Sequence, residues 1–162
     1  MYKFSFMLKS YSGDFKYAQR LVDSFNRYNK ENLLMHIVVP EADYDLFKGS
    51  LQSENIDVLN EDVMGFDFVD DDSIRGIRPG YINQEIVKLQ FWEAGLTENY
   101  FCIDSDSQFI RDFQINDFMF DHSTPYSVLV EDKELQVDPL YYAEYWQGRA
   151  QLLDAIKHEL DI

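Results

Sequence analysis

Several features that mark particular classes of protein are missing from this sequence. Its 162 residues include one cysteine, Cys102, which excludes an internal disulfide, and no apolar run of about 18 residues, so no transmembrane helix is expected. Residues 1–9 alternate as a strand does and do not resemble a signal peptide. Because Cys102 lies in an apolar segment, we expect a buried thiol and a reducing cytoplasm. A peripheral position at the inner membrane face is left open.

Basic side chains are scarce. The sequence has 14 Lys and Arg residues and 30 Asp and Glu residues, which gives a formal net charge of −16. A surface this acidic repels phosphate backbones, so nucleic acid is not an expected partner, and it gives no general attraction to anionic membranes. A bound cation would still invert the local field and allow a phosphorylated small molecule to bind.

Several catalytic and nucleotide-binding motifs are also absent. The sequence has neither a Walker A motif nor a dinucleotide-binding glycine motif. Its three histidines lack metal-ligand spacing, which argues against a zinc site. Ser107 has no nearby histidine to activate it, which argues against a serine hydrolase. His36 lies in an apolar segment and is predicted to be a core histidine.

The sequence does contain enough apolar material for a folded globule. With 46% hydrophobic and 16% aromatic residues, it predicts a single domain over residues 1–162. Strand and helix patterns alternate over the first 60 residues, which predicts an α/β fold with a parallel sheet. The expected strands are Lys3–Leu8, Leu34–Val39 and Ile56–Leu59, and the expected helices are residues 15–28 and 43–52.

The second half of the chain continues with a long loop over residues 60–80 and a helix over Tyr81–Ala94, which Gly95 ends. A further strand is expected at Ser127–Val130. A helix is expected to start at Asp138 and Pro139, and a long helix carries apolar residues between Leu152 and Leu160.

The most informative segment is Tyr100–Ile110. Strand-type apolar residues lead directly into Asp104 and Asp106, spaced i, i+2. Open α/β sheets bind ligands at the carboxyl ends of their strands, and carboxylate oxygens suit a hard divalent cation. Two carboxylates in an apolar strand would carry a desolvation cost without a partner, so we expect a metal, or an ion pair with Arg111 as the alternative.

The spacing of this acidic pair is weak support when taken alone. In so acidic a chain, about two Asp-x-Asp matches are expected by chance. The sequence has three: Asp43–Asp45 at an expected helix start, Asp70–Asp72 in an acidic run, and Asp104–Asp106. Only the third interrupts an apolar strand, so its context carries the argument.

Two segments, Asn83–Leu89 and Asn99–Asp112, resemble nucleotide-sugar glycosyltransferases of the GT-A fold. In a bacterial group of surface-polysaccharide glycosyltransferase-like proteins, a Gln-x-x-x-Lys-Leu helix likewise precedes an Asp-Ser-Asp strand. Other parts of the chain match that group as well: Ser10–Asp14, Val38–Pro40 and Thr124–Tyr126. The resemblance implies a Rossmann-like GT-A fold with a mostly parallel central sheet and flanking helices. The implied activity is transfer of a sugar from a nucleotide-sugar donor to a glycan acceptor.

The resemblance also implies roles for particular residues. Asp104 and Asp106 would bind Mn²⁺ or Mg²⁺, which bridges the donor diphosphate and acts as a Lewis acid. The residues implied in donor binding are Ser10, Tyr11, Ser12, Asp14, Arg75, Arg78, Gln84, Lys88 and Ser105. Among them, Gln84 and Lys88 lie i, i+4 on one helix face, and the two arginines suit phosphate oxygens.

Proteins of the resembling group are considerably longer than this chain. The elements that bind the acceptor and supply the catalytic base would lie beyond its last helix. We therefore expect a truncated, donor-binding half, completed by further sequence or by another chain in an oligomer.

Two alternatives stay open. A haloacid-dehalogenase-like phosphatase also places Asp-x-Asp after an apolar strand, with the first Asp as nucleophile, although Ser107 and Gln108 depart from that pattern. The other alternative is a non-catalytic subunit that binds a nucleotide sugar without turnover.

Overall fold

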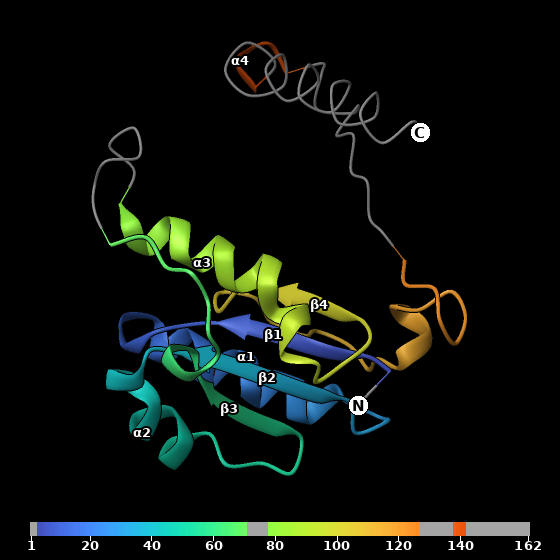
Figure 1. Ribbon diagram of the computed structural model, residues 1–162. Coiled ribbons are helices and arrows are strands. Elements are labelled where there is room, and N and C mark those ends of the chain that lie inside the picture. The colour runs from blue at the N-terminus through green and yellow to red at the C-terminus, as the bar shows by residue number, and fades with distance from the viewer. Residues whose placement is uncertain (1–2, 71–77, 127–137, 142–162) are drawn as a thin grey trace. The chain divides into compact units, whose positions relative to one another are not determined.

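The computed structural model describes residues 3–70, 78–126 and 138–141 (Figure 1). The chain divides into two compact units, residues 1–126 and 127–162, and each is described by itself. The prediction that residues 1–162 form one domain stays a prediction.

In the second unit the structure describes the short helix α4 (Pro139–Tyr141). Its start was predicted, and the Asp138 carboxylate accepts a hydrogen bond from the backbone N–H of Leu140 at 3.0 Å. The expected strand at 127–130 and the expected helix around 152–160 lie outside the described residues.

The first unit contains a four-stranded sheet in the order β3-β2-β1-β4. Its strands are β1 (Ser5–Lys9), β2 (Leu34–Val39), β3 (Ile56–Asn60) and β4 (Tyr100–Ile103). All three strand pairs are parallel, which confirms the predicted α/β class and parallel sheet. In the register, Met7 of β1 lies between His36 of β2 and Cys102 of β4, so the carboxyl ends of the strands meet at one edge.

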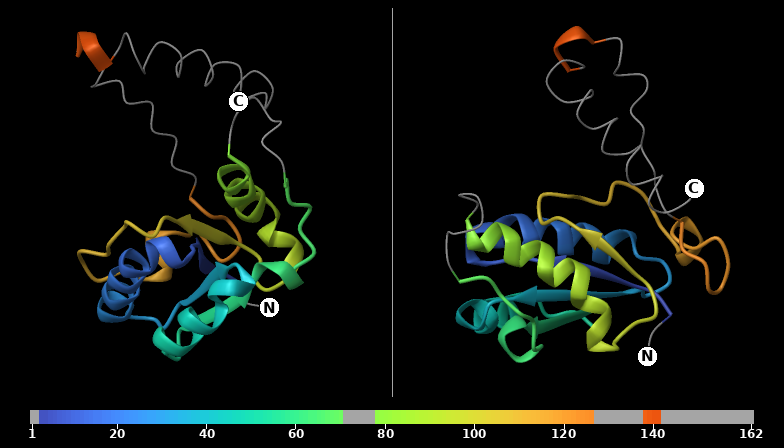
Figure 2. Two further views of the ribbon diagram at one scale, coloured as in Figure 1. Left: turned by 90° about the vertical axis from the view of Figure 1, so that its left-hand side faces the viewer. Right: turned by 45° about the horizontal axis from the view of Figure 1, so that its top comes forward.

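Helices cover both faces of this sheet (Figures 1 and 2). Alternate residues of the central strands point to opposite faces, so Phe6 packs in the cluster with α1 (Phe15–Tyr28) and α2 (Glu41–Ser50). Met7 packs on the opposite face with residues of α3 (Pro79–Gln90). Burial of both faces explains why the central strands are continuous apolar runs.

The segment that follows β4 returns across the α1 face. Phe6 lies at the centre of an aromatic cluster, with ring centroids 5.4 Å from Phe109, 5.7 Å from Phe113 and 4.9 Å from Phe118. The N–H of Phe113 also donates to the carbonyl of Tyr28 at 3.1 Å. These contacts hold the residues after the acidic pair alongside α1.

The predicted boundaries of two helices, α2 and α3, differ from the structure. α3 ends at Gln90, and a 3₁₀ turn continues over Phe91–Ala94 before Gly95, whose φ of 64° is left-handed. α2 begins at Glu41, earlier than expected, where the Asp62 carboxylate accepts a hydrogen bond from the Glu41 N–H at 2.8 Å. That bond satisfies a helix-terminal donor from a residue distant in sequence.

The prediction of a buried Cys102 thiol is wrong, because Cys102 is exposed. β4 lies at an edge of the four-stranded sheet, with β1 as its neighbour. The apolar sequence of β4 predicted a strand correctly but did not reveal this position. None of the helices within the described ranges is both long enough and apolar enough to cross a bilayer.

Candidate acidic cleft at the carboxyl edge of the sheet

A cleft of about 380 Å³ lies where β1 and β4 end. The acidic pair directly follows β4, and Lys9 is the last residue of β1. Tyr17 of α1 and Gln84 of α3 also line the cleft. Its lining residues are Lys9, Asp14, Tyr17, Gln84, Asp104, Ser105 and Asp106. The structure thus brings together five of the predicted site residues from three separate parts of the sequence.

Lys88 supplies the positive charge next to the acidic pair. Its Nζ lies 3.1 Å from Asp104 Oδ1 and 3.3 Å from Glu85 Oε1, and its side chain is 17% exposed. Partial burial lowers the pKa of Lys88, but the contacts with Asp104 and Glu85 outweigh it and raise the pKa above its usual value. The Tyr100 hydroxyl donates to the Lys88 carbonyl at 2.7 Å and so ties α3 to β4.

The acidic pair is not buried. The Asp104 side chain is 65% exposed and Asp106 is also exposed, so the expected desolvation cost does not arise. The alternative ion pair with Arg111 is not found among the described residues either, because that guanidinium pairs with Asp117, at 4.0 Å. Asp104 and Asp106, which follow the apolar strand, therefore lie in solvent, while Ser105 between them is buried.

A second lysine, Lys9, was not predicted. It forms a largely buried ion pair with Glu61, with Nζ 2.7 Å from Oε2 and side chains 9% and 12% exposed. Lys9 Nζ also donates to the carbonyl of Ser10 at 3.0 Å. Its position as the last residue of the first strand was the available sequence signal, since that strand end faces the same sheet edge.

The turn between β1 and α1 was predicted to hold the nucleotide. Asp14 lines the cleft, and its Oδ2 accepts a long hydrogen bond of 3.4 Å from Ser105 Oγ. Ser10 is buried, and its hydroxyl has no hydrogen-bond partner among the described residues. The Ser12 N–H donates to Asp43 at 2.7 Å, and the Tyr11 ring lies against Gly13. Neither Ser12 nor Tyr11 lines the cleft.

The two predicted arginines are not brought to the cleft by the described structure. Arg78 is exposed at the N-terminus of α3 and is not a lining residue. Arg75 lies outside the described residues. Tyr17, in the first turns of α1, does line the cleft, although nothing in its local sequence pattern set it apart.

The carboxylates present suit a divalent cation only in part. Across residues 3–70, 78–126 and 138–141, no group of three or more His, Cys, Asp or Glu side chains is arranged to hold a metal. Asp104 and Asp106 still line one cleft and are exposed. Mg²⁺ is typically bound through one or two carboxylates together with waters and substrate phosphates, so two oxygen donors fit that mode.

Fold and site define an α/β protein with a parallel sheet and an acidic cleft at its carboxyl edge. A family described as a "Family of unknown function (DUF6492)" matches residues 4–162, and the chain belongs to this family. Comparison with curated proteins and with solved structures gives no match.

Proposed function

We propose that this chain is the donor-binding part of a metal-dependent glycosyltransferase of the GT-A type. It would transfer a sugar from a nucleotide-sugar donor to a glycan acceptor in bacterial surface-polysaccharide synthesis. One observation carries the proposal: Asp104 and Asp106 line a cleft at the carboxyl edge of a parallel sheet, and Lys88 forms an ion pair with Asp104.

The residues of the cleft have distinct parts in this proposal. Asp104 and Asp106 would hold Mn²⁺ or Mg²⁺, which supplies Lewis-acid stabilisation of the departing nucleoside diphosphate. Lys88 keeps its proton, because its contacts with Asp104 and Glu85 raise its pKa, and so offers a cation to a donor phosphate. Gln84 lines the cleft one helical turn before Lys88 and offers an amide to the donor.

The test is a titration of the chain with UDP and with GDP, each with and without Mn²⁺, followed by calorimetry and thermal shift. We expect metal-dependent binding of one nucleotide, weakened at least tenfold in Asp104→Ala and Asp106→Ala. Asp45→Ala is the matched control, because Asp45 belongs to another Asp-x-Asp pair, is exposed on α2 and does not line the cleft. No nucleotide binding, or equal binding in all three variants, would overturn the proposal.

Two further measurements separate the alternatives. Release of inorganic phosphate from p-nitrophenyl phosphate that Asp104→Asn abolishes would favour a haloacid-dehalogenase-like phosphatase. Metal-dependent nucleotide binding without hydrolysis of the matching sugar nucleotide would favour a non-catalytic binding subunit.

A further inference from the structure

Two more clefts adjoin the acidic cleft. A cleft of about 190 Å³ shares Tyr17, Ser105 and Asp106 with it. A third cleft, of about 350 Å³, shares Arg20 and Gln108 with the second. Each cleft shares lining residues with the next, and we call the three clefts together the α1 groove. α1 forms one side of it and residues 104–110 form the other.

The charge of the α1 groove changes sign along its length. The acidic cleft holds three carboxylates and Lys9. The third cleft instead holds Arg20 and Arg27, with Asp23 as its one acidic residue. Within the described part of the chain, neither guanidinium lies within ion-pair distance of a carboxylate. The third cleft is the end of the groove distal to the acidic cleft, and we call it the distal end. It is therefore a basic site on a strongly acidic protein.

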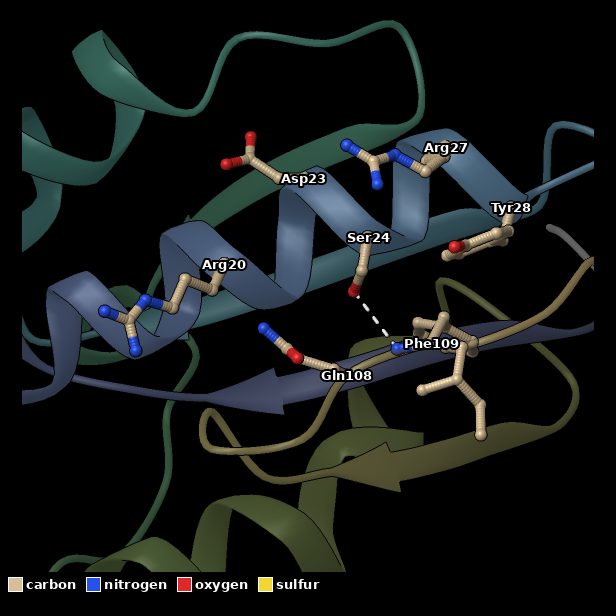
Figure 3. A pocket seen from close by; sticks show the side chains of 8 residues that line it. Arg20, Asp23, Ser24, Arg27, Tyr28, Gln108 and Phe109 are labelled. Carbon is tan, nitrogen blue, oxygen red and sulfur yellow. Dashed lines mark hydrogen bonds between the residues drawn. The ribbon is translucent and has the colours of Figure 1, made fainter.

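The two arginines lie on the same side of α1. They are seven residues apart, which places them about 10 Å apart along the helix axis at 1.5 Å per residue. Figure 3 shows both on α1, with the Gln108 amide approaching the helix from the segment after β4. Two guanidiniums and an amide present several hydrogen-bond donors to a ligand oxyanion.

The distal end has a fixed floor. Ser24 Oγ accepts a hydrogen bond from the Phe109 N–H at 3.1 Å, drawn in Figure 3, and donates to the Leu21 carbonyl at 2.8 Å. This bond joins the two sides of the groove. Next to it lie the half-buried Tyr28 and Ile110, whose side chain is 85% exposed. Aromatic and apolar groups beside charged ones suit the ring of a sugar.

We propose that the distal end of the α1 groove binds an acidic saccharide, through a carboxylate or phosphate held by Arg20 and Arg27. The inference rests on the proposed function, in which this saccharide is the acceptor. The acidic cleft binds the cation and the donor, and the α1 groove leads from it to a cleft lined by two arginines. The sign of the charge at each end matches the ligand proposed there.

The experiment follows backbone amide shifts of the full chain by NMR during titration with glucuronate, glucose 6-phosphate and neutral glucose. We expect saturable shifts at Gln108 and Phe109 with the anionic sugars and none with glucose. Preference for glucuronate or for glucose 6-phosphate identifies the acidic group. Arg20→Gln with Arg27→Gln should weaken binding at least tenfold, while Lys16→Gln, an exposed cation of α1 that does not line the groove, should leave it unchanged.

Absence of saturable shifts, or equal affinity in the double variant and the Lys16→Gln control, would overturn the inference. Circular dichroism confirms that the double variant is folded, as expected for exposed side chains. Asp104→Ala distinguishes the two proposals: it should weaken nucleotide binding at least tenfold and leave anionic-sugar binding intact. Saccharide binding without any nucleotide binding contradicts the proposed function, whereas nucleotide binding without saccharide binding contradicts only the α1 groove.

Discussion

His36 shows how burial controls a single side chain. It lies in β2 and is 1% exposed, with Nδ1 3.4 Å from Asp57 Oδ2 on the neighbouring strand. Burial lowers the pKa of His36, and the contact with Asp57 offsets part of that effect. The sequence prediction of a core histidine is therefore confirmed. The His36 ring packs in the core beside the Phe91 ring, and the two ring centroids lie 5.4 Å apart.

The lowered pKa of His36 predicts a pH-dependent stability. Below pH 6.5 the unfolded chain binds a proton that the folded chain does not, so the free energy of unfolding falls as pH falls. One such proton limits the slope to about 1.4 kcal/mol per pH unit. Urea denaturation between pH 5 and 7.5 should show that the free energy of unfolding falls toward low pH, with a slope below this limit, in the natural chain and in His122→Gln, an exposed control. It should be flatter in His36→Met, and an equal slope in both variants would contradict the prediction.

Lys88 gives the second prediction at this scale. Its replacement in Lys88→Met leaves Asp104 and Glu85 without their cation and removes a donor to phosphate. We expect nucleotide affinity in the presence of Mn²⁺ to fall about tenfold, or about 1.4 kcal/mol. Lys48→Met is the matched control, since Lys48 contacts Asp57 at 3.8 Å and does not line the acidic cleft. Unchanged affinity in Lys88→Met, measured by calorimetry, would remove Lys88 from donor binding.

At the scale of elements, two glycines test how backbone conformation ends a helix. Gly95 has φ 64° after the 3₁₀ turn that follows α3, whereas Gly49 lies within α2. An added Cβ would meet nothing within 4 Å at either position, so packing does not distinguish them. Any difference between their alanine variants therefore reports on the backbone alone.

We expect the two alanine variants to have effects of opposite sign. Gly95→Ala forces a left-handed conformation on a residue with a Cβ and should cost about 1 kcal/mol of unfolding free energy. Gly49→Ala lowers the entropy of the unfolded chain and favours the helix, so it should stabilise by about 0.5 kcal/mol. Urea denaturation measures both. A neutral or stabilising effect of Gly95→Ala would show that this position does not require glycine, and a destabilising effect of Gly49→Ala would contradict the expected gain in α2.

Helices and strands of the first unit followed from local sequence, because hydrophobic periodicity depends on neighbouring residues. The start of α2 was missed because Asp62, 21 residues away, satisfies the N–H of Glu41. The end of α3 was predicted through Gly95, although its last turn tightens to a 3₁₀ helix. The start of α2 thus depended on a residue distant in sequence, whereas the helix itself was predicted from local periodicity.

At the scale of the whole molecule, the first unit holds its own hydrophobic core. Both apolar clusters, one on each face of the sheet, consist of residues within 4–119. The acidic cleft and the α1 groove also lie entirely in this unit. These facts predict that residues 1–126 fold without residues 127–162.

The test is expression of residues 1–126 alone. We expect a cooperative urea transition and the same nucleotide and anionic-sugar binding as in the full chain, because every described residue that carries those proposals is present. Circular dichroism and calorimetry measure both properties. A fragment without a cooperative transition would show that the first unit requires the second to fold.

By itself, the sequence determined the parallel α/β class, the strands and helices of the first unit, and the position of Asp104 at the carboxyl edge of the sheet. These follow from local periodicity and from the rule that parallel strands share a carboxyl edge. That Asp14 and Gln84 belong to the same site was implied only by the family resemblance. Only the tertiary structure decided that the acidic pair and Cys102 are exposed and that Lys9 and Tyr17 line the cleft. It alone revealed the α1 groove, because its two sides are separated by about 80 residues and are brought together by the aromatic packing around Phe6.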